Sequence, residues 1–186
     1  QVIHWIRGAV ELSDGRIATI SESSRELCFF DSAGVLLRVV GREGDGPGEF
    51  RNPYQLARLR GDTLVVAERG VRRISWFSQE GQFIHAETPD LAEARALGRE
   101  KASVGQAWFV PPKSILLMLS DESRIPVGLR WRIPLQFVLA DADGSDPVRV
   151  GSFRGGEVYM LDESLAGKAF FSNGTYAAFG GSLRRV

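Results

Sequence analysis

The chain has 186 residues, of which 44% are hydrophobic and 25% charged, and its formal net charge is zero. This composition excludes a globally disordered chain and gives room for one substantial domain or two small ones. The balanced charge argues against a global field that attracts nucleic acid or anionic membranes. No apolar run reaches the roughly 18 residues that a membrane helix needs, and the lone Cys28, expected to be buried, rules out an intrachain disulfide.

Two consecutive segments, 12–38 and 59–85, align without a gap, so that Leu12 meets Leu59 and Gly34 meets Gly81. Each contains a short apolar run, a Gly/Asp turn, a β-rich run, a polar turn, an apolar-aromatic run and, after a glycine, a last run. Runs of four to six residues bounded by Gly, Asp and Ser predict strands and hairpins. Four strands in a unit of about 40–50 residues match the size of a propeller blade.

The repeat predicts an all-β fold, a single partial β-propeller over residues 1–186 with four-stranded antiparallel blades. The expected blade units are about 8–40, 53–88, 104–153 and 168–186, the last ending in mid-blade at Val186. We therefore expect missing C-terminal blades, or self-association, to cover the open sheet edges. A closed four-bladed ring, completed by residues 1–7, is the alternative architecture.

Two linkers join these units. The first, VGREGDGPGEFRNP at 40–53, lacks the Lys-Ser/Thr pair of a phosphate-binding P-loop, and its end at Pro53 opposes the helix of a dinucleotide fold. It predicts an inter-blade connector in which glycines allow positive φ and Phe50 packs between sheets. In the second linker, Leu91–Leu97 predicts one or two helical turns. The aromatic residues expected in the inter-blade core are Phe29, Phe30, Trp76 and Phe77.

The loop from Gly41 to Pro53 matches G-x-x-G-x-G-P-G-x-F-x-x-P, and Arg73 to Phe83 matches R-I-x-x-F-x-x-x-G-x-F. These patterns resemble the NHL-type repeat of six-bladed β-propellers. The usual Asp after the second strand is replaced by Glu68 in the second unit and Ser21 in the first. The resemblance implies a six-bladed ring of a bacterial kind that is often secreted or lipid-anchored, and hence an extracytoplasmic (periplasmic or secreted) location.

Signals for metal or acid–base chemistry are sparse. The only histidines, His4 and His85, are expected to be ordinary strand residues. The stretch DADGSD carries Asp141, Asp143 and Asp146, whose carboxylates could coordinate calcium. It lacks the EF-hand spacing and falls where a hairpin turn is expected. We therefore expect no cofactor and no metal, with calcium at this turn as the weaker alternative.

Arginine supplies the candidate binding residues. The stretch RIPVGLRWRIP, 124–134, is predicted as a loop insertion. Arginines with aromatic side chains can contact nucleic acid, and some NHL propellers bind RNA. The simpler interpretation is a long loop in which the tryptophan packs inward and the arginines face solvent. The candidate binding residues are Arg69, Arg72, Arg124, Arg130, Trp131 and Arg132.

These features favour a non-catalytic β-propeller scaffold that binds a protein or a small-molecule ligand. No catalytic residue is predicted. One alternative is a propeller-type hydrolase or lyase whose metal-dependent central site lies partly outside this chain. A second alternative is RNA binding through the Arg/Trp loop, which the neutral net charge disfavours.

Overall fold

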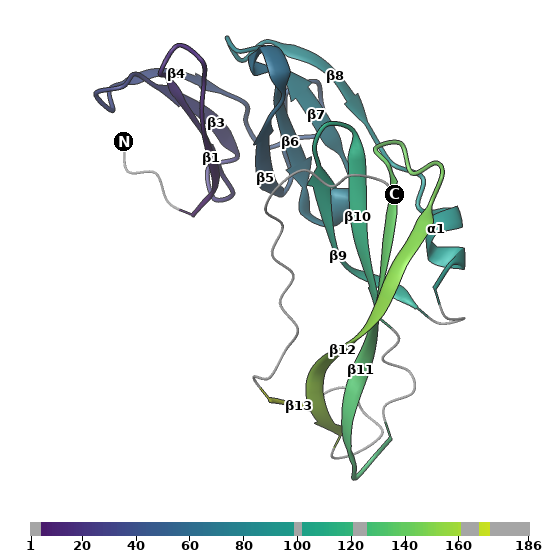
Figure 1. Ribbon diagram of the computed structural model, residues 1–186. Helices are drawn as coiled ribbons and strands as arrows, with labels where there is room; N and C mark the ends of the chain where they lie inside the picture. The colour runs from purple at the N-terminus through teal and green to yellow at the C-terminus, as the bar shows by residue number, and fades with distance from the viewer. Residues whose placement is uncertain (1–4, 99–101, 121–125, 161–167, 172–186) are drawn as a thin grey trace.

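The computed structural model describes residues 5–98, 102–120, 126–160 and 168–171 as three consecutive antiparallel sheets (Figure 1). The first sheet contains β1 (Ile6–Glu11), β2 (Ile17–Ser21), β3 (Glu26–Phe30) and β4 (Leu36–Val40). The second contains β5 (Pro53–Arg58), β6 (Leu64–Glu68), β7 (Ile74–Phe77) and β8 (Phe83–Glu87). The third contains β9 (Ser103–Val110), β10 (Ser114–Ser120), β11 (Arg130–Asp141), β12 (Val148–Met160) and β13 (Lys168–Phe171).

Each of the first two sheets is a meander in which consecutive strands pair in order. In the second sheet, β6 and β7 are buried along their whole length, whereas β8 is largely exposed. Two buried faces on the middle strands indicate that this sheet is packed between two neighbours. The outer strand β4 of the first sheet is likewise exposed. Sequential four-stranded meanders that pack face to face are propeller-like blades, so the predicted fold class is confirmed.

Two apolar clusters join the sheets. One contains Ile20, Phe29 and Phe50 on the side of the first sheet, together with Leu56 and Phe77 of the second. The other joins the second and third sheets, and within it Phe109 of β9 lies edge-on to the Trp76 ring, 6.1 Å away. The Gln55 side chain of β5 also bonds the Phe109 N–H and C=O, each at 2.8 Å. Adjacent blades thus share both core and backbone contacts.

Residues 41–52, which we call the connector, link β4 to β5 as the sequence predicts. Phe50 is fully buried, and its ring lies 5.6 Å from that of Phe77. Gly41 has φ +93°, and a Cβ there would come within 2.5 Å of the Phe50 ring, so both conformation and space require glycine. Of the four aromatic residues predicted for the core, Phe29, Trp76 and Phe77 are buried and Phe30 is half-buried.

The second linker forms the short helix α1 (Ala92–Ala96), within the span predicted for helical turns. His85 lies on β8 as expected and stacks on Trp76 at 4.4 Å. Cys28 is buried, and this burial raises the pKa of its thiol. No helix among the described residues is both long and apolar enough to cross a membrane.

The prediction of a loop over 124–134 is wrong for its second half. Residues 130–134 are the start of β11, which extends beyond the part that pairs with β10 and is paired there with β12 (Figure 1). Pro134 directly precedes the part of β11 that pairs with β10, so its missing N–H costs no hydrogen bond to that strand. Trp131 is 40% exposed rather than packed inward, because β10 pairs only from Leu135 onward.

The predicted fourth unit lies mostly outside the described residues. Lys168–Phe171 pairs with β12 as the fifth strand of the third sheet. Residues 172–186, the rest of that predicted unit, are not described. The fourth blade and the number of blades in a closed ring therefore stay predictions.

Asp62 joins the second sheet to the first and predicts a specific acid sensitivity. Only 4% exposed, its carboxylate accepts hydrogen bonds from the Ser13 hydroxyl and, at 3.0 Å, from the Ser13 N–H, with Arg58 3.4 Å away. The hydrogen bond from the Ser13 hydroxyl is the largest cause that holds the Asp62 pKa below its usual 3.8, and the backbone N–H and Arg58 add to it. A lowered folded-state pKa contributes stability that is present above the unfolded pKa and is lost as pH falls through the folded pKa.

Asp62→Asn is therefore expected to lower the melting temperature at neutral pH. The difference from the wild type should shrink as pH falls through and below the usual range of a carboxyl group, as Asp62 protonates in the unfolded and then in the folded state. Thermal unfolding of both proteins across this range measures the effect. A difference that stays constant with pH would contradict the assigned role of the carboxylate charge.

Candidate binding site

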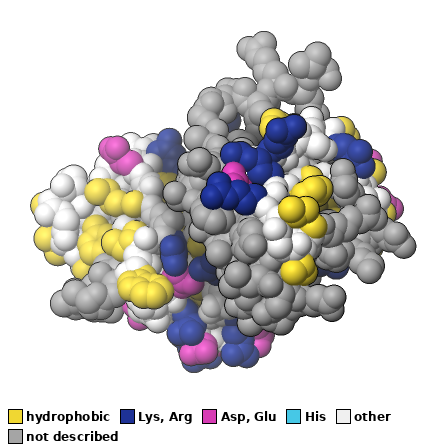
Figure 2. Space-filling view, turned by 90° about the horizontal axis from the view of Figure 1, so that it is seen from below, with side chains coloured by type: hydrophobic (Ala, Val, Ile, Leu, Met, Phe, Trp, Pro, Cys, Tyr) yellow, Lys and Arg dark blue, Asp and Glu magenta, His cyan; other side chains and the backbone are white. Residues whose placement is uncertain are grey.

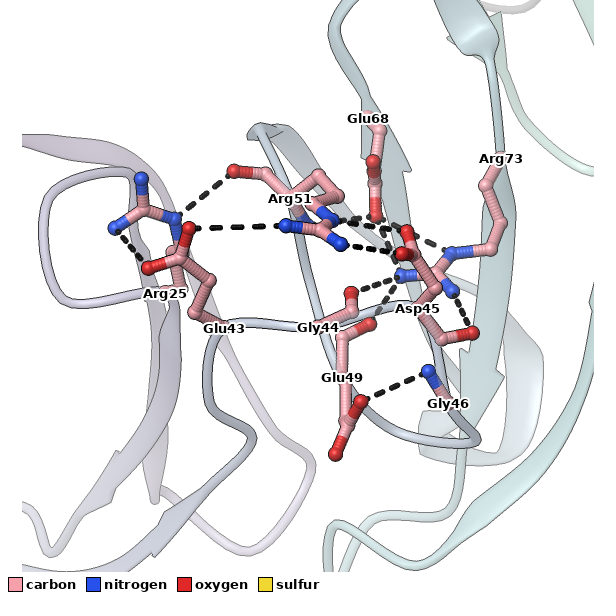
Figure 3. Close-up of polar contacts among 9 residues, drawn as sticks. All are labelled: Arg25, Glu43, Gly44, Asp45, Gly46, Glu49, Arg51, Glu68 and Arg73. Atoms are coloured by element: carbon pink, nitrogen blue, oxygen red, sulfur yellow. Dashed lines mark hydrogen bonds and ion pairs between the residues drawn. The ribbon is translucent and has the colours of Figure 1, made fainter.

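Arginine side chains gather at the end of the second sheet where the connector meets the turn between β6 and β7, residues 69–73 (Figure 3). In a meander, consecutive turns lie at alternate ends of the sheet, so the β2–β3 turn of the first sheet falls at this same end. The contacts confirm this placement, because Arg25 of that turn donates to the Arg51 carbonyl at 3.0 Å. Figure 2 shows basic side chains in clusters with acidic ones among them.

Arg73 fixes the connector to the second sheet. Its guanidinium lies 2.8 Å from the carboxylate of Glu68, which is only 6% exposed. The same guanidinium donates to the carbonyls of Asp45 at 2.8 Å, Gly44 at 3.4 Å and Glu49 (Figure 3). Glu68 also accepts the Arg51 N–H at 3.2 Å. Glutamate thus ties the turn and connector together at the position where the NHL pattern usually has aspartate.

Arg51 is held by acidic residues of the connector. Its Nε donates to Asp45 Oδ1 at 3.0 Å, and Glu43 lies 3.9 Å from its guanidinium. The hydrogen bond from Arg51 is the main cause that lowers the Asp45 pKa, and the charges of Arg51 and Arg73 act in the same direction. Asp45 is therefore ionised and paired at neutral pH, which makes it a poor proton acceptor.

Tyr54, near the start of β5, stacks with two arginines. The guanidinium of Arg69 lies 4.4 Å from the centre of its ring and that of Arg7 lies 5.2 Å away. Glu22 pairs with both arginines, at 2.9 Å for Arg69. These two arginine hydrogen bonds lower the Glu22 pKa although burial, the largest single influence, raises it. The stack places Arg69 at the wall of a cavity.

This cavity lies between the second and third sheets and has a volume of about 890 Å³. We call it the arginine cavity. Its walls are the connector, the β6–β7 turn, the segment 88–95 and the start of β9 at 104–107. The charged side chains that line it are Arg51, Arg69, Arg72, Arg73, Arg95, Asp45 and Glu68. Five arginines thus face two carboxylates in a chain whose net charge is zero.

Two of these arginines differ from the others in having no carboxylate partner among the described residues. Arg51, Arg69 and Arg73 are each paired with a carboxylate. Arg72 and Arg95 are exposed, and no ion pair joins either of them to another residue in the described part of the chain. They belong to separate elements, the β6–β7 turn and α1. The arrangement can therefore offer two free guanidinium groups to an anion.

The structure places the predicted binding residues in two groups. Arg69 and Arg72 line the arginine cavity, whereas Arg130, Trp131 and Arg132 lie on β11 and do not line it. Glu157 of β12 lies 3.4 Å from Arg130 and 3.6 Å from Arg132, so these arginines share a carboxylate. Arg124 lies outside the described residues. The cavity residues that the sequence interpretation missed are Arg51, Tyr54, Arg73 and Arg95. For Arg73 alone, the density of arginine in ERGVRR, 68–73, was an available signal.

The turn that carries Asp141, Asp143 and Asp146 uses its polar atoms internally. Asp141 pairs with Lys113 at 3.1 Å, and Asp143 accepts hydrogen bonds from the Ser145 N–H and hydroxyl. The Ser145 hydroxyl is the main cause that lowers the Asp143 pKa. Within the described ranges no three His, Cys, Asp or Glu residues group in a way that could hold a metal ion. Calcium binding at this turn stays an untested prediction.

Comparisons with known proteins give one short sequence match and several distant structural ones. No protein-family model matches the chain. A 63-residue segment is 36% identical to the RING finger protein nhl-1 of Caenorhabditis elegans, covering 34% of this chain and 6% of that protein. A presumed exported protein of Bacteroides fragilis is 10% identical with a TM-score of 0.47, over 82% of this chain and 52% of its own.

Two further solved structures are similar at the same level. A protein of unknown function from Bacteroides caccae is 15% identical with a TM-score of 0.44, over 76% of this chain and 48% of its own. A dihydro-heme d1 dehydrogenase is 14% identical with a TM-score of 0.43, over 83% and 39%. This chain thus spans about half or less of each of these four proteins. The chain is an all-β, β-propeller-like protein with a short segment similar to an NHL-named protein.

Proposed function

We propose that this protein is a non-catalytic binding scaffold that holds an anionic partner at its arginine-rich end. The observation that carries the proposal is the arginine cavity, in which five arginines face two carboxylates although the chain is neutral overall. A local excess of one charge in a hollow concentrates ligands of the opposite charge. A β-propeller-like fold by itself fixes no activity, so the site must supply the argument.

The chemistry of the cavity favours binding over catalysis. Among the described residues that line it there is no His, Cys, Lys or Ser. Its two carboxylates, Asp45 and Glu68, are paired with Arg51 and Arg73. General acid–base catalysis needs a group whose pKa lies near the working pH, and arginine does not meet that need. The metal-dependent hydrolase or lyase and the RNA-binding alternatives have less support.

The NHL resemblance extends the proposal to the whole ring. We propose that these blades belong to a six-bladed NHL-type propeller in an extracytoplasmic bacterial protein. Further blades, or a second copy, would cover the open face and edge of the first sheet. Support comes from its exposed apolar side chains, which Figure 2 shows gathered at that end of the molecule. They are Ile17, Val35, Leu36, Leu37 and Val39.

The proposal predicts that the neutral chain binds an anionic surface through its arginine-rich end. Near neutral pH, the wild type is expected to be retained on a sulfonate cation-exchange resin and to elute as salt is raised, because exposed charges are screened. Arg72→Glu with Arg95→Glu should elute at markedly lower salt. The salt concentration at elution is the measurement.

The matched control is Arg38→Glu with Arg60→Glu, which makes the same change in net charge at exposed arginines outside the cavity. It should elute close to the wild type. An equal shift in elution salt for both double variants would contradict the proposal, because only net charge would then matter. Failure of the wild type to bind the resin would contradict it as well.

A further inference from the structure

We infer that the arginine cavity takes a small molecule that carries two or more anionic groups close together, either phosphates or carboxylates. This inference rests on the proposed function and goes beyond it by naming the class of ligand. Its basis is the placement, on separate walls of one cavity, of two guanidinium groups that have no ion-pair partner within the described ranges.

The size of the cavity fits a small molecule. Its volume of about 890 Å³ lies within the roughly 300–1,000 Å³ usual for small-molecule sites. The walls come from the connector, the β6–β7 turn, the segment after β8 and the start of β9. The ion pair of Glu68 with Arg73 and the hydrogen bonds of Arg73 to the connector carbonyls hold two of these walls together. A largely pre-formed site avoids the ordering cost of binding.

The charges indicate a ligand with more than one anionic group. Arg51, Arg69 and Arg73 already have carboxylate partners. Arg72 and Arg95 have none among the described residues, and they line the cavity from the β6–β7 turn and from α1. The planar guanidinium group binds phosphate or carboxylate through two parallel hydrogen bonds. A ligand with two such groups can therefore engage both arginines at once from their separate walls.

Neutral polar side chains in the same walls can orient the ligand. Asn52, Tyr54, Thr88 and Gln106 line the cavity and offer amide and hydroxyl groups that donate and accept hydrogen bonds. A few such groups among charged ones are what fixes the orientation of a bound molecule.

The surroundings of the cavity favour a compact ligand over an extended polyanion. Glu43 and Asp45 are well exposed beside Arg51, with more than half of each side chain accessible. Glu22 lies between Arg7 and Arg69. These carboxylates interrupt the basic surface, and a nucleic-acid backbone that ran across it would meet like charge.

Isothermal titration of the 186-residue chain with pyrophosphate and, separately, with citrate tests the inference. At least one of them should bind saturably at one site per chain, more tightly than inorganic phosphate or acetate. Binding by pyrophosphate alone assigns a phosphorylated ligand, and binding by citrate alone assigns a polycarboxylate. Arg72→Ala with Arg95→Ala should weaken binding at least about tenfold, since each removed guanidinium takes a charge-assisted hydrogen bond with it.

Two further variants keep the test interpretable. Arg72→Lys with Arg95→Lys retains the charge but not the planar fork, and it should bind more weakly than the wild type and more tightly than the alanine pair. Arg38→Ala with Arg60→Ala should bind like the wild type. If neither compound binds saturably, or if the cavity variants bind as well as the wild type, the inference is overturned. A resin interaction that still depends on Arg72 and Arg95 would then leave the broader proposal standing, with a short oligonucleotide or an acidic protein as the next probe.

Discussion

Replacing Arg73 with methionine is expected to lower the free energy of unfolding by about 3–5 kcal/mol. The substitution leaves Glu68 as a buried carboxylate without its counter-charge, 2.8 Å from where the guanidinium was. It also removes the donor that the carbonyls of Gly44, Asp45 and Glu49 share. Breaking one partner of a buried pair costs more than the pair contributes, because the remaining charge is stranded. Denaturant unfolding measures the change.

Arg72→Ala is the matched control, since this arginine is the neighbour of Arg73 in the same turn but is exposed and outside the network. Its effect should stay within about 0.5 kcal/mol. Adding Glu68→Gln to Arg73→Met should recover part of the loss, because the stranded charge is then removed. A loss below about 1 kcal/mol for Arg73→Met alone would contradict the buried network, since that is the range of an exposed ion pair.

Replacing Phe50 with alanine is expected to cost about 3–5 kcal/mol of the free energy of unfolding. The ring is fully buried between the first two sheets, and it contacts Phe77 on one side and the backbone at Gly41 on another. Its loss leaves a cavity in the apolar cluster that joins the blades, and the fixed ends of the connector limit collapse into that space. Thermal and denaturant unfolding of the variant measure the effect.

Phe153→Ala is the control for Phe50→Ala, because it removes the same atoms from a ring that is 50% exposed on β12. The Phe153 ring lies edge-on to that of Phe137 at 5.5 Å, and its removal should cost much less because half of it already faces solvent. Similar losses for the two variants would show that Phe50 is not the inter-blade anchor.

The sequence predicted the first two sheets well because their pattern is repeated. The alignment of 12–38 with 59–85 sets strands, turns and glycines in register, and β2 to β4 and β6 to β8 follow it, while β1 and β5 directly precede the aligned segments. The connector was also predicted on physical grounds, because its glycines allow positive φ where the chain reverses and Phe50 can pack between two sheets. Glu68 and Ser21, which depart from the usual aspartate, still accept hydrogen bonds from the turns that follow them, from the Arg73 guanidinium and the Ser24 N–H respectively.

The third sheet could not be predicted to the same depth. The stretch 124–134 was predicted as a loop because it is an insertion that the other units lack, yet alternation in RWRI continues β11 past β10. Trp131 was expected to pack inward, but no part of β10 pairs with that end of β11.

The sequence predicted only some of the residues that line the arginine cavity, for a related reason. Arg69 and Arg72 stand out in ERGVRR, but the other walls come from Arg95 and Gln106, which are distant in the sequence. Only the packing of the second sheet against the third brings these residues together. Local pattern therefore predicted two of the three arginines that one turn supplies and missed Arg95, whose place in the cavity depends on blade packing.

The most direct test of the account locates a bound anion in the protein. Backbone amide chemical shifts of the 15N-labelled chain would be recorded as pyrophosphate is added. We expect the largest saturable changes at Arg69–Arg73, Arg95 and Val104–Ala107, which line the arginine cavity, and little change at the β1–β2 turn around Asp14. Changes spread evenly over surface arginines, or centred on β11 near Arg130 and Arg132, would contradict the arginine cavity as the binding site of this scaffold.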